Sequence, residues 1–417
     1  MTTPTKNLTA HFELDHLFKI RVFMDHGGYQ ALKKVLAEGT SAQVLEAVKK
    51  ANLRGRGGAG FPAGLKWGFV PKSTDKPKYL CVNADEGEPG TFKDRYILNH
   101  NPHLLIEGIV ICSFAVGIHA AYVYIRGEYE AVARRLEGAI EEATANGFLG
   151  KNILGSGFDL ELRVHRGAGS YICGEETALL ESLEGKRGNP RLKPPFPAFV
   201  GLFGCPTVIN NIETLANVPS IIDHGPEWFL AQGRPNDGGT RIFGVSGAVN
   251  KPGIYELPVG TSLREIIETH GGGIKDGKKL KAVIPGGMSS PILRADEIDL
   301  RMDCDSVTAA GSMIGSGAVI VIDDATPILD VLKKVAKFYA HESCGQCTPC
   351  RLGTSWMNKI VQRLAAGDGR KTDLDDLLRL ASNIKGRTLC PMGDAASMPV
   401  LSIIQKFRKE LDETVKN

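Results

Sequence analysis

Hydrophobic positions in the first half of the chain alternate between two patterns. Runs rich in β-branched and aromatic residues, typical of strands, occur at the start of residues 79–90 and in residues 120–129. Segments with helical spacing occupy residues 103–117 and 132–147, and residues 158–185 read as strand, glycine-rich loop and helix. This alternation predicts a largely parallel α/β sheet covered by helices. Ligands bind such sheets in the loops that follow the strands.

A different pattern occupies residues 241–273. It predicts a strand, a Lys-Pro-Gly turn, a second strand, and a helix that begins at Thr261 or Ser262. Residues 282–287 and 317–323 supply further strands. Together these segments predict a small α+β module of ordinary domain size.

The last part of the chain has only helical periodicity. Apolar residues recur at helical spacing in four segments, with Thr372 as the expected N-cap of the third. Four such segments predict a helical bundle. The predicted organisation is a lead-in at 1–45, an α/β domain at 46–238, the α+β module at 239–326 and the bundle at 327–417.

Composition narrows the function classes. The 417 residues carry a net charge of +3 without a long run of like charges, which argues against a nucleic-acid or acidic-membrane partner. The N-terminus lacks the features of a signal or transit peptide, so we expect a soluble protein of a reducing compartment. Residues 108–125 contain no Asp, Glu, Lys or Arg, yet their strand-like second half predicts a buried helix and strand rather than a membrane span.

Three of the nine cysteines, Cys344, Cys347 and Cys350, fall three residues apart in HESCGQCTPCRLG. This spacing is typical of iron–sulfur ligands, and Cys390, the only later cysteine, can complete a set of four. Structural zinc and unligated thiols are the alternatives that the spacing leaves open. The remaining cysteines are expected to be small buried hydrophobic residues: Cys81, Cys112, Cys173, Cys205 and Cys304.

Five glycines lie within the ten residues 55–64. Gly55, Gly57 and Gly60 match G-x-G-x-x-G, but the preceding residues have helical character, so the dinucleotide fingerprint is rejected. Residues without Cβ still let the backbone close around a phosphate or a flat ring. Positive charge nearby is expected from Arg54, Arg56 and Lys66.

Three further polar loops follow predicted elements, at residues 83–95, 166–197 and 206–219. Each alone could be structural. Together with the glycine loop they place four polar, glycine-rich loops on one sheet domain, which is the pattern of a large nucleotide site.

These stretches, in this order, resemble the NADH-binding, flavin-carrying subunit of respiratory complex I, the bacterial proton-translocating NADH:quinone oxidoreductase. The matching segments are RGRGGAGFPAGLKW, NADEGEPGTFKDR, YICGEETALLESLEGKRGNPRLKPPFP, INNIETLANVP and ESCGQCTPCRLG. The resemblance implies a Rossmann-like FMN- and NADH-binding α/β domain, a ubiquitin-like β-grasp domain of the SLBB type and a C-terminal four-helix bundle with one [4Fe–4S] cluster.

The resemblance also assigns site residues. FMN would contact Gly55, Gly57, Gly58, Lys66, Asn83, Asp85, Tyr171, Gly174, Asn210 and Asn211, with Arg54, Arg56, Ala59 and Gly60 in the same cofactor-binding loop. NADH would stack its adenine on Phe61, Phe69 and Phe196 and make polar contacts with Glu88, Glu175, Glu176 and Lys193. Glu88 is the candidate catalytic residue, and the cluster ligands would be Cys344, Cys347, Cys350 and Cys390.

The implied function is oxidation of NADH by hydride transfer to FMN, followed by one-electron transfer to the cluster. The implied partners are a small thioredoxin-like [2Fe–2S] subunit and a large multi-cluster iron–sulfur subunit. The expected location is a peripheral arm at the cytoplasmic face of the bacterial inner membrane, without direct membrane insertion.

Two other functions are kept open. The same module serves as the diaphorase subunit of NAD-linked hydrogenases and formate dehydrogenases. Such chains often carry further N-terminal domains, so the early start of the shared core favours complex I. An alternative from another class is a non-enzymatic, zinc-stapled scaffold with an orphan nucleotide pocket.

Overall fold

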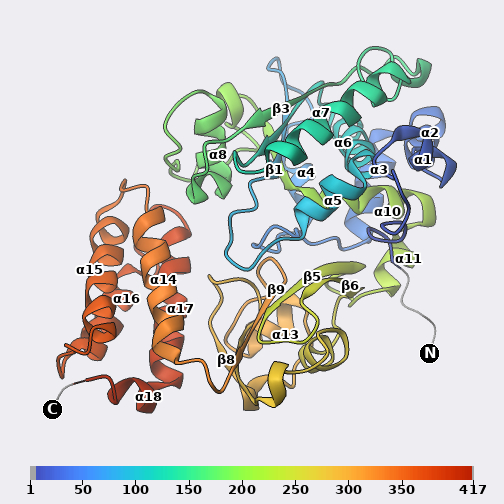
Figure 1. The fold of residues 1–417 in the computed structure, drawn as a ribbon. Helices are drawn as coiled ribbons and strands as arrows, with labels where there is room; N and C mark the ends of the chain where they lie inside the picture. The colour runs from blue at the N-terminus through green and yellow to red at the C-terminus, as the bar shows by residue number, and fades with distance from the viewer. Residues whose placement is uncertain (1–5, 416–417) are drawn as a thin grey trace.

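The computed structural model describes residues 6–415, so the first five residues of the predicted lead-in lie outside the described part. The chain forms two separate sheets, the first covered by helices, and a helical bundle that stands beside them (Figure 1). The first sheet consists of β1 (Tyr79–Ala84), β2 (Ala120–Ile125), β3 (Glu161–Arg166) and β4 (Thr207–Asn211).

All strand pairs of the first sheet are parallel, and their order is β3-β2-β1-β4. The predicted parallel sheet is therefore confirmed. The chain moves from β1 outward through β2 to β3 and then returns to place β4 on the other side of β1. The strand order thus reverses between β1 and β4, and ligands of open α/β sheets bind in the crevice at such a switch point.

Helices cover this sheet, and the described N-terminal residues form helices too. In chain order they are α1 (Ile20–Asp25), α2 (Gln30–Glu38), α3 (Ser41–Lys50), α4 (Ala63–Gly68), α5 (Asp94–His100), α6 (Pro102–Val116), α7 (Glu130–Ala145), η1 (Ile153–Gly155), η2 (Tyr171–Gly174), α8 (Glu176–Leu183), η3 (Leu202–Gly204), α9 (Ile212–Ala216), α10 (Val218–His224) and α11 (Pro226–Ala231). Helix α3 runs through the predicted boundary at 45/46.

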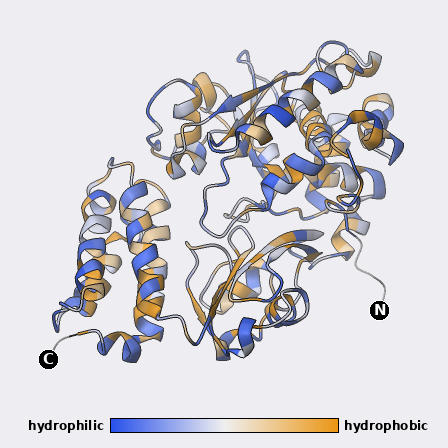
Figure 2. Ribbon diagram, viewed as in Figure 1, coloured by the Kyte–Doolittle hydropathy of each residue, from blue (hydrophilic) through white to orange (hydrophobic). Residues whose placement is uncertain are grey.

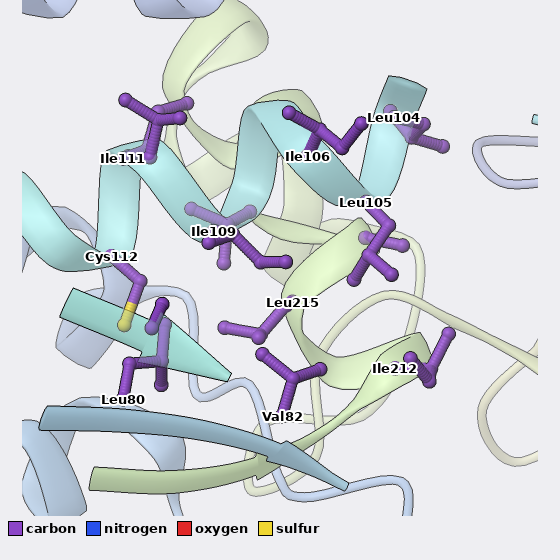
Figure 3. Close-up of a cluster of buried hydrophobic side chains, with 14 of the residues drawn as sticks. Leu80, Val82, Leu104, Leu105, Ile106, Ile109, Ile111, Cys112, Ile212 and Leu215 are labelled. Carbon is purple, nitrogen blue, oxygen red and sulfur yellow. The ribbon is translucent and has the colours of Figure 1, made fainter. Parts of the chain in front are cut away.

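Helix α6 carries apolar residues on every side, and neighbouring elements bury nearly all of them. Its side chains meet those of β1 and α9, as Figure 3 shows for Ile109, Val82 and Leu215. A Cβ at Gly108 would lie 2.1 Å from the Leu215 carbonyl oxygen, so this close approach requires glycine. Residues 108–125 form the end of α6 and then β2, as predicted. Across residues 6–415, no helix combines the length and the apolar character needed to cross a membrane.

The second sheet is mixed, with the order β6-β5-β9-β7-β8. Ser262 caps the helix that follows β6, since its Oγ accepts the Glu265 N–H, and so Ser262 is the starting residue. The elements are β5 (Thr240–Gly247), β6 (Gly253–Pro258), α12 (Leu263–Glu265), the π-helical turn η4 (Ile266–His270), η5 (Lys275–Gly277), β7 (Leu280–Ile284), β8 (Leu293–Arg294), η6 (Ala295–Glu297), α13 (Cys304–Ala309) and β9 (Ala318–Asp323).

The predicted bundle is present as α14 (Ile328–Glu342), α15 (Thr348–Ala365), α16 (Asp373–Ile384) and α17 (Met392–Lys406), followed by the short α18 (Arg408–Asp412). Each long helix carries apolar and polar stretches side by side (Figure 2). Thr372 precedes α16, but its side chain makes no capping bond, contrary to the prediction. The Asp373 carboxylate accepts the Arg370 N–H instead and fixes the turn.

Candidate functional site

The glycine loop lies between α3 and α4 and reaches the end of β4. A Cβ on Gly57 would stand 2.9 Å from the Cβ of Asn211, so the loop approaches that strand as only glycine allows. The element before the loop is helix α3, which agrees with the rejection of a dinucleotide fingerprint. The loop therefore borders the switch point between β1 and β4.

Within residues 6–415, the segment after β1 contains a buried polar atom without a hydrogen-bond partner, which a flavin nucleotide could supply. The Oδ2 atom of Asp85 is buried and has no hydrogen-bond partner among the described residues. Burial raises the pKa of Asp85 to about 7, although the charge of Arg126 opposes the rise. Gly58 has a φ of +134° and no atom within 4 Å of its Cβ position. Unpaired carboxylate and open backbone suit the ribityl hydroxyls and phosphate of FMN.

The three predicted amides frame this edge of the sheet. Asn83 donates to the Gly174 carbonyl oxygen at 2.8 Å. Asn210 accepts the Trp67 indole N–H at 2.7 Å, and Asn211 donates to Asp94 at 2.6 Å. These side chains are engaged within the protein and fix the loops at this edge of the sheet.

The two predicted arginines of the glycine loop are both paired with carboxylates. Arg56 is fully buried and pairs with Asp237 at 2.6 Å, and its own N–H donates to Thr214. Arg54 pairs with Asp305 at 3.5 Å. The expectation that Arg56 adds positive charge to the loop is corrected, because Asp237 neutralises that charge and the guanidinium also donates to the Gly238 and Thr240 carbonyl oxygens.

An ion-pair network surrounds the start of α8. Lys66 approaches Glu176 at 3.0 Å, and Lys193 bridges Glu175 at 3.2 Å and Glu176 at 3.1 Å. Burial opposes ionisation of Glu176, but the two lysines hold its pKa below the ordinary value. Glu175 also caps α8 by accepting the Thr177 N–H at 2.8 Å. Glu176 is thus held in its ionised form by two lysines, one on each carboxylate oxygen.

The structure brings two of the three predicted aromatic rings together. The ring centroids of Phe61 and Phe69 lie 6.0 Å apart, and the side chains are 44% and 51% exposed. Phe196 is 54% exposed, and no ring contact joins it to either of the others in the described residues. Such exposure is unusual for phenylalanine and suits stacking on a ligand base.

Glu88 has partners that the sequence did not reveal. Its carboxylate accepts the Ser289 N–H and O–H and the Tyr171 O–H, each at 2.7 Å. Ser289 also bonds to the Tyr339 hydroxyl at 2.8 Å. Ser289 follows a Gly-Gly pair after β7, which is the one sequence signal that marks it, whereas Tyr339 carries none.

The four predicted ligand thiols lie at one end of the bundle. Cys344 and Cys347 occupy the loop between α14 and α15, Cys350 lies in the first turn of α15, and Cys390 precedes α17. Burial raises the pKa of Cys390 to about 12, as do the charges of Glu175 and Cys344. The Arg187 guanidinium donates to the Cys344 carbonyl oxygen at 3.2 Å, so the first cysteine loop contacts the segment that follows α8.

The thiols do not form a closed ligand shell, since within residues 6–415 no three His, Cys, Asp or Glu side chains are gathered as for a single metal ion. Four sulfur donors on two loops are the donor set of a [4Fe–4S] cluster. Of the five remaining cysteines, Cys304 is partly exposed, contrary to the prediction, because it opens α13 beside Gly60.

Glycine-rich and polar loops at the switch point of a parallel sheet, together with four thiols at one end of a helical bundle, are the arrangement expected of a flavin- and iron–sulfur-dependent oxidoreductase. Family models match three regions: the Nuo51 FMN-binding domain at residues 48–220, the SLBB domain at 241–321 and the NADH-ubiquinone oxidoreductase-F iron-sulfur binding region at 330–414.

Similar proteins extend the match over most of the chain. The F subunit 2 of the NADH-quinone oxidoreductase of Rhizobium meliloti is 56% identical over 92% of this chain and 91% of its own length. The corresponding F subunit of Rickettsia felis is 52% identical over 94% and 92%. A NAD+-reducing [NiFe]-hydrogenase in the H2-reduced state superposes with a TM-score of 0.87, at 35% identity over 99% of this chain and 67% of that one.

The chain belongs to the family of NADH-quinone oxidoreductase F subunits. The predicted fold class, enzyme class and cofactors are confirmed: FMN, NADH and one [4Fe–4S] cluster. The individual ligand-binding residues and the domain limits stay predictions.

Proposed function

We propose that this chain is the electron-input subunit of a proton-translocating NADH:quinone oxidoreductase. Flavin takes the hydride of NADH and gives up electrons singly, and the cluster carries one electron at a time. The single observation that carries the proposal is the nearness of two groups from different parts of the fold. Arg187, in the segment that follows α8, donates from its guanidinium to the carbonyl oxygen of Cys344 in the bundle at 3.2 Å.

The protein's own residues supply binding and orientation. Asp85 and the glycine loop receive FMN. Phe61 and Phe69 stack on the adenine of NADH, and Lys193 contacts its polar groups. Glu176, held ionised by the two lysines, accepts a hydrogen bond from the adenosine 2′-hydroxyl and repels a 2′-phosphate. Cys344, Cys347, Cys350 and Cys390 bind the cluster as thiolates.

Membership of the family implies that the chain works within a complex of several subunits. The proposed partners are a small thioredoxin-like [2Fe–2S] subunit and a large multi-cluster subunit. The proposed place is a peripheral arm at the cytoplasmic face of the bacterial inner membrane. Trp356 and Leu352, 48% and 38% exposed on the helix that begins at the cysteine loop, give the bundle an apolar surface for such a partner.

A diaphorase subunit of an NAD-linked hydrogenase is the second candidate, favoured by the superposition on the NAD+-reducing hydrogenase. Affinity purification of the chain from its native cells separates the two. Co-purification of a multi-cluster subunit with membrane subunits supports the proposal. Co-purification of a nickel-containing hydrogenase subunit would replace it with the second candidate.

Cofactor analysis tests the site itself. The purified protein should be brown-yellow, release FMN on denaturation and contain four iron and four sulfide per chain for one [4Fe–4S] cluster. A colourless protein that binds zinc would contradict the assignment.

A further inference from the structure

The carboxylate of Glu88 is held by a residue of the second sheet's module. Three donors converge on it: the Ser289 N–H, the Ser289 O–H and the Tyr171 O–H. An ionised carboxylate accepts all three hydrogen bonds. In a protonated carboxyl group one oxygen carries the proton and is a poorer acceptor, so one of the three bonds would be weakened. The hydrogen bonds therefore favour the ionised form and one orientation of Glu88.

The loop that carries Ser289 is shaped to close over Glu88. Gly287 has a φ of +95°, and a Cβ there would lie 2.6 Å from the Cγ of Glu88. The Met288 N–H donates to the Pro89 carbonyl oxygen at 3.1 Å, which fixes the loop alongside the segment after β1. The contact is therefore built by backbone as well as side chain.

The bundle completes the arrangement. Because Ser289 has one hydroxyl proton, which it gives to Glu88, the Tyr339 hydroxyl must donate to Ser289 across 2.8 Å. The Tyr171 ring packs edge-on against Phe338, with centroids 5.1 Å apart. Glu88 thus receives hydrogen bonds, directly or in sequence, from all three parts of the fold.

We propose that Ser289 is a positioning residue for Glu88, and that Tyr339 positions Ser289 in turn. This inference rests on the proposed place of Glu88 in the NADH site. Burial raises the pKa of Glu88, and the bonds from Tyr171 and Ser289 oppose that rise. Among residues 6–415, the titratable side chains facing Glu88 are Tyr171 from η2 and Tyr339 from α14. Loss of the Ser289 hydroxyl therefore raises the Glu88 pKa further.

The direct test is carboxyl ¹³C NMR on the full chain with its cofactors bound and oxidised, labelled at glutamate, with the Glu88 resonance identified by its absence in Glu88→Gln. Ser289→Ala should raise the pKa of Glu88 by about one unit, since a hydrogen bond to a charged group is lost. Tyr339→Phe should raise it less, and Ser289→Thr should restore it. Ser290→Ala is the matched control, because the neighbouring Ser290 hydroxyl is buried without a partner in the described residues.

The consequence for NADH is read in the loaded enzyme. The acid limb of kcat/KM for NADH, measured with ferricyanide, should move to higher pH by about the same unit in Ser289→Ala and stay in place in Ser290→Ala. In Glu88→Gln, adding Ser289→Ala should change nothing further. A Glu88 pKa that is equal in Ser289→Ala and Ser290→Ala would overturn the inference. Failure of NADH to bleach the wild-type flavin would instead count against the proposed function.

Discussion

The nucleotide site and the cysteine loops each bind a redox cofactor, but they differ in how far their side chains are already bonded within the protein. At the nucleotide site most of the predicted polar side chains are already bonded to other protein groups, as in the network of Lys66, Glu176 and Lys193. Among the described residues of the bundle the thiols have few hydrogen-bond partners, such as the Ser343 hydroxyl 3.3 Å from the Cys350 sulfur. The crevice is therefore preorganised by the protein, whereas the cysteine loops depend on the metal they bind.

This difference predicts that the two sites fail independently. Changes in the cysteine loops should remove a cofactor outright, while changes in the crevice should alter affinity or selectivity by degrees. Four substitutions test this contrast.

The largest effect is expected from Cys390→Ala. Three thiolates hold a cubane cluster poorly, so the variant should lose the EPR signal of the reduced cluster and still release FMN on denaturation. Cys304→Ala, which removes a thiol beside the glycine loop, is the control and should keep the cluster. An intact [4Fe–4S] signal in Cys390→Ala would show that another group is the fourth ligand.

Glu176→Ala should change nucleotide selectivity. Removing the carboxylate costs a hydrogen bond to NADH and relieves repulsion of the 2′-phosphate of NADPH. The ratio of kcat/KM for the two nucleotides should shift by roughly ten- to a hundredfold, or about 1.4–2.7 kcal/mol. Ferricyanide reductase assays measure it, with flavin and cluster contents expected to stay normal. An unchanged ratio would mean that Glu176 merely favours the helix start.

Phe69→Ala should weaken NAD+ binding to the oxidised protein by about 0.5–1.5 kcal/mol beyond the loss of contact area, with FMN retained. Phe203→Ala is the matched control, since that ring is 55% exposed and lies outside the proposed NADH contacts. Loss of flavin, or equal affinities in the two variants, would remove Phe69 from the NADH site. A core role would appear as lower thermal stability instead.

The smallest effect concerns Asp85 in the FMN-free protein. Its pKa of about 7 in the folded state exceeds the ordinary value of 3.8, so its ionisation destabilises the fold as pH rises between those values. Asp85→Asn should therefore raise Tm by a few degrees at pH 8.5 and by less at pH 5. Asp75→Asn, at an exposed position, serves as the control. A gain that grows toward low pH has the wrong sign for this account.

Local patterns predicted most of the elements because their causes are local. Ser262 starts its helix through a bond to a residue three positions away. Long-range pairs had no such signal: Ser289 meets Glu88 across 201 positions, and Arg56 meets Asp237 across 181. Burial within α15 is also a tertiary outcome, because Met357 and Val361 are buried while Trp356 is 48% exposed.

The candidate site divides in the same way. The glycine loop, the acidic loop and the cysteine spacing could be recognised as chemistry-bearing motifs. Whether each side chain faces the ligand or a neighbouring residue depended on tertiary contacts. For example, one carboxylate oxygen of Glu175 accepts hydrogen bonds that cap α8, whereas Glu176 forms ion pairs with the lysines.

The central claim is that electrons from NADH reach the cluster through this one chain. The most direct test is an anaerobic titration of the purified protein with NADH, followed by visible absorption and low-temperature EPR. We predict bleaching of the flavin together with the EPR signal of a reduced [4Fe–4S] cluster. A cluster that dithionite reduces but NADH leaves silent, although the flavin is bleached, would contradict the account.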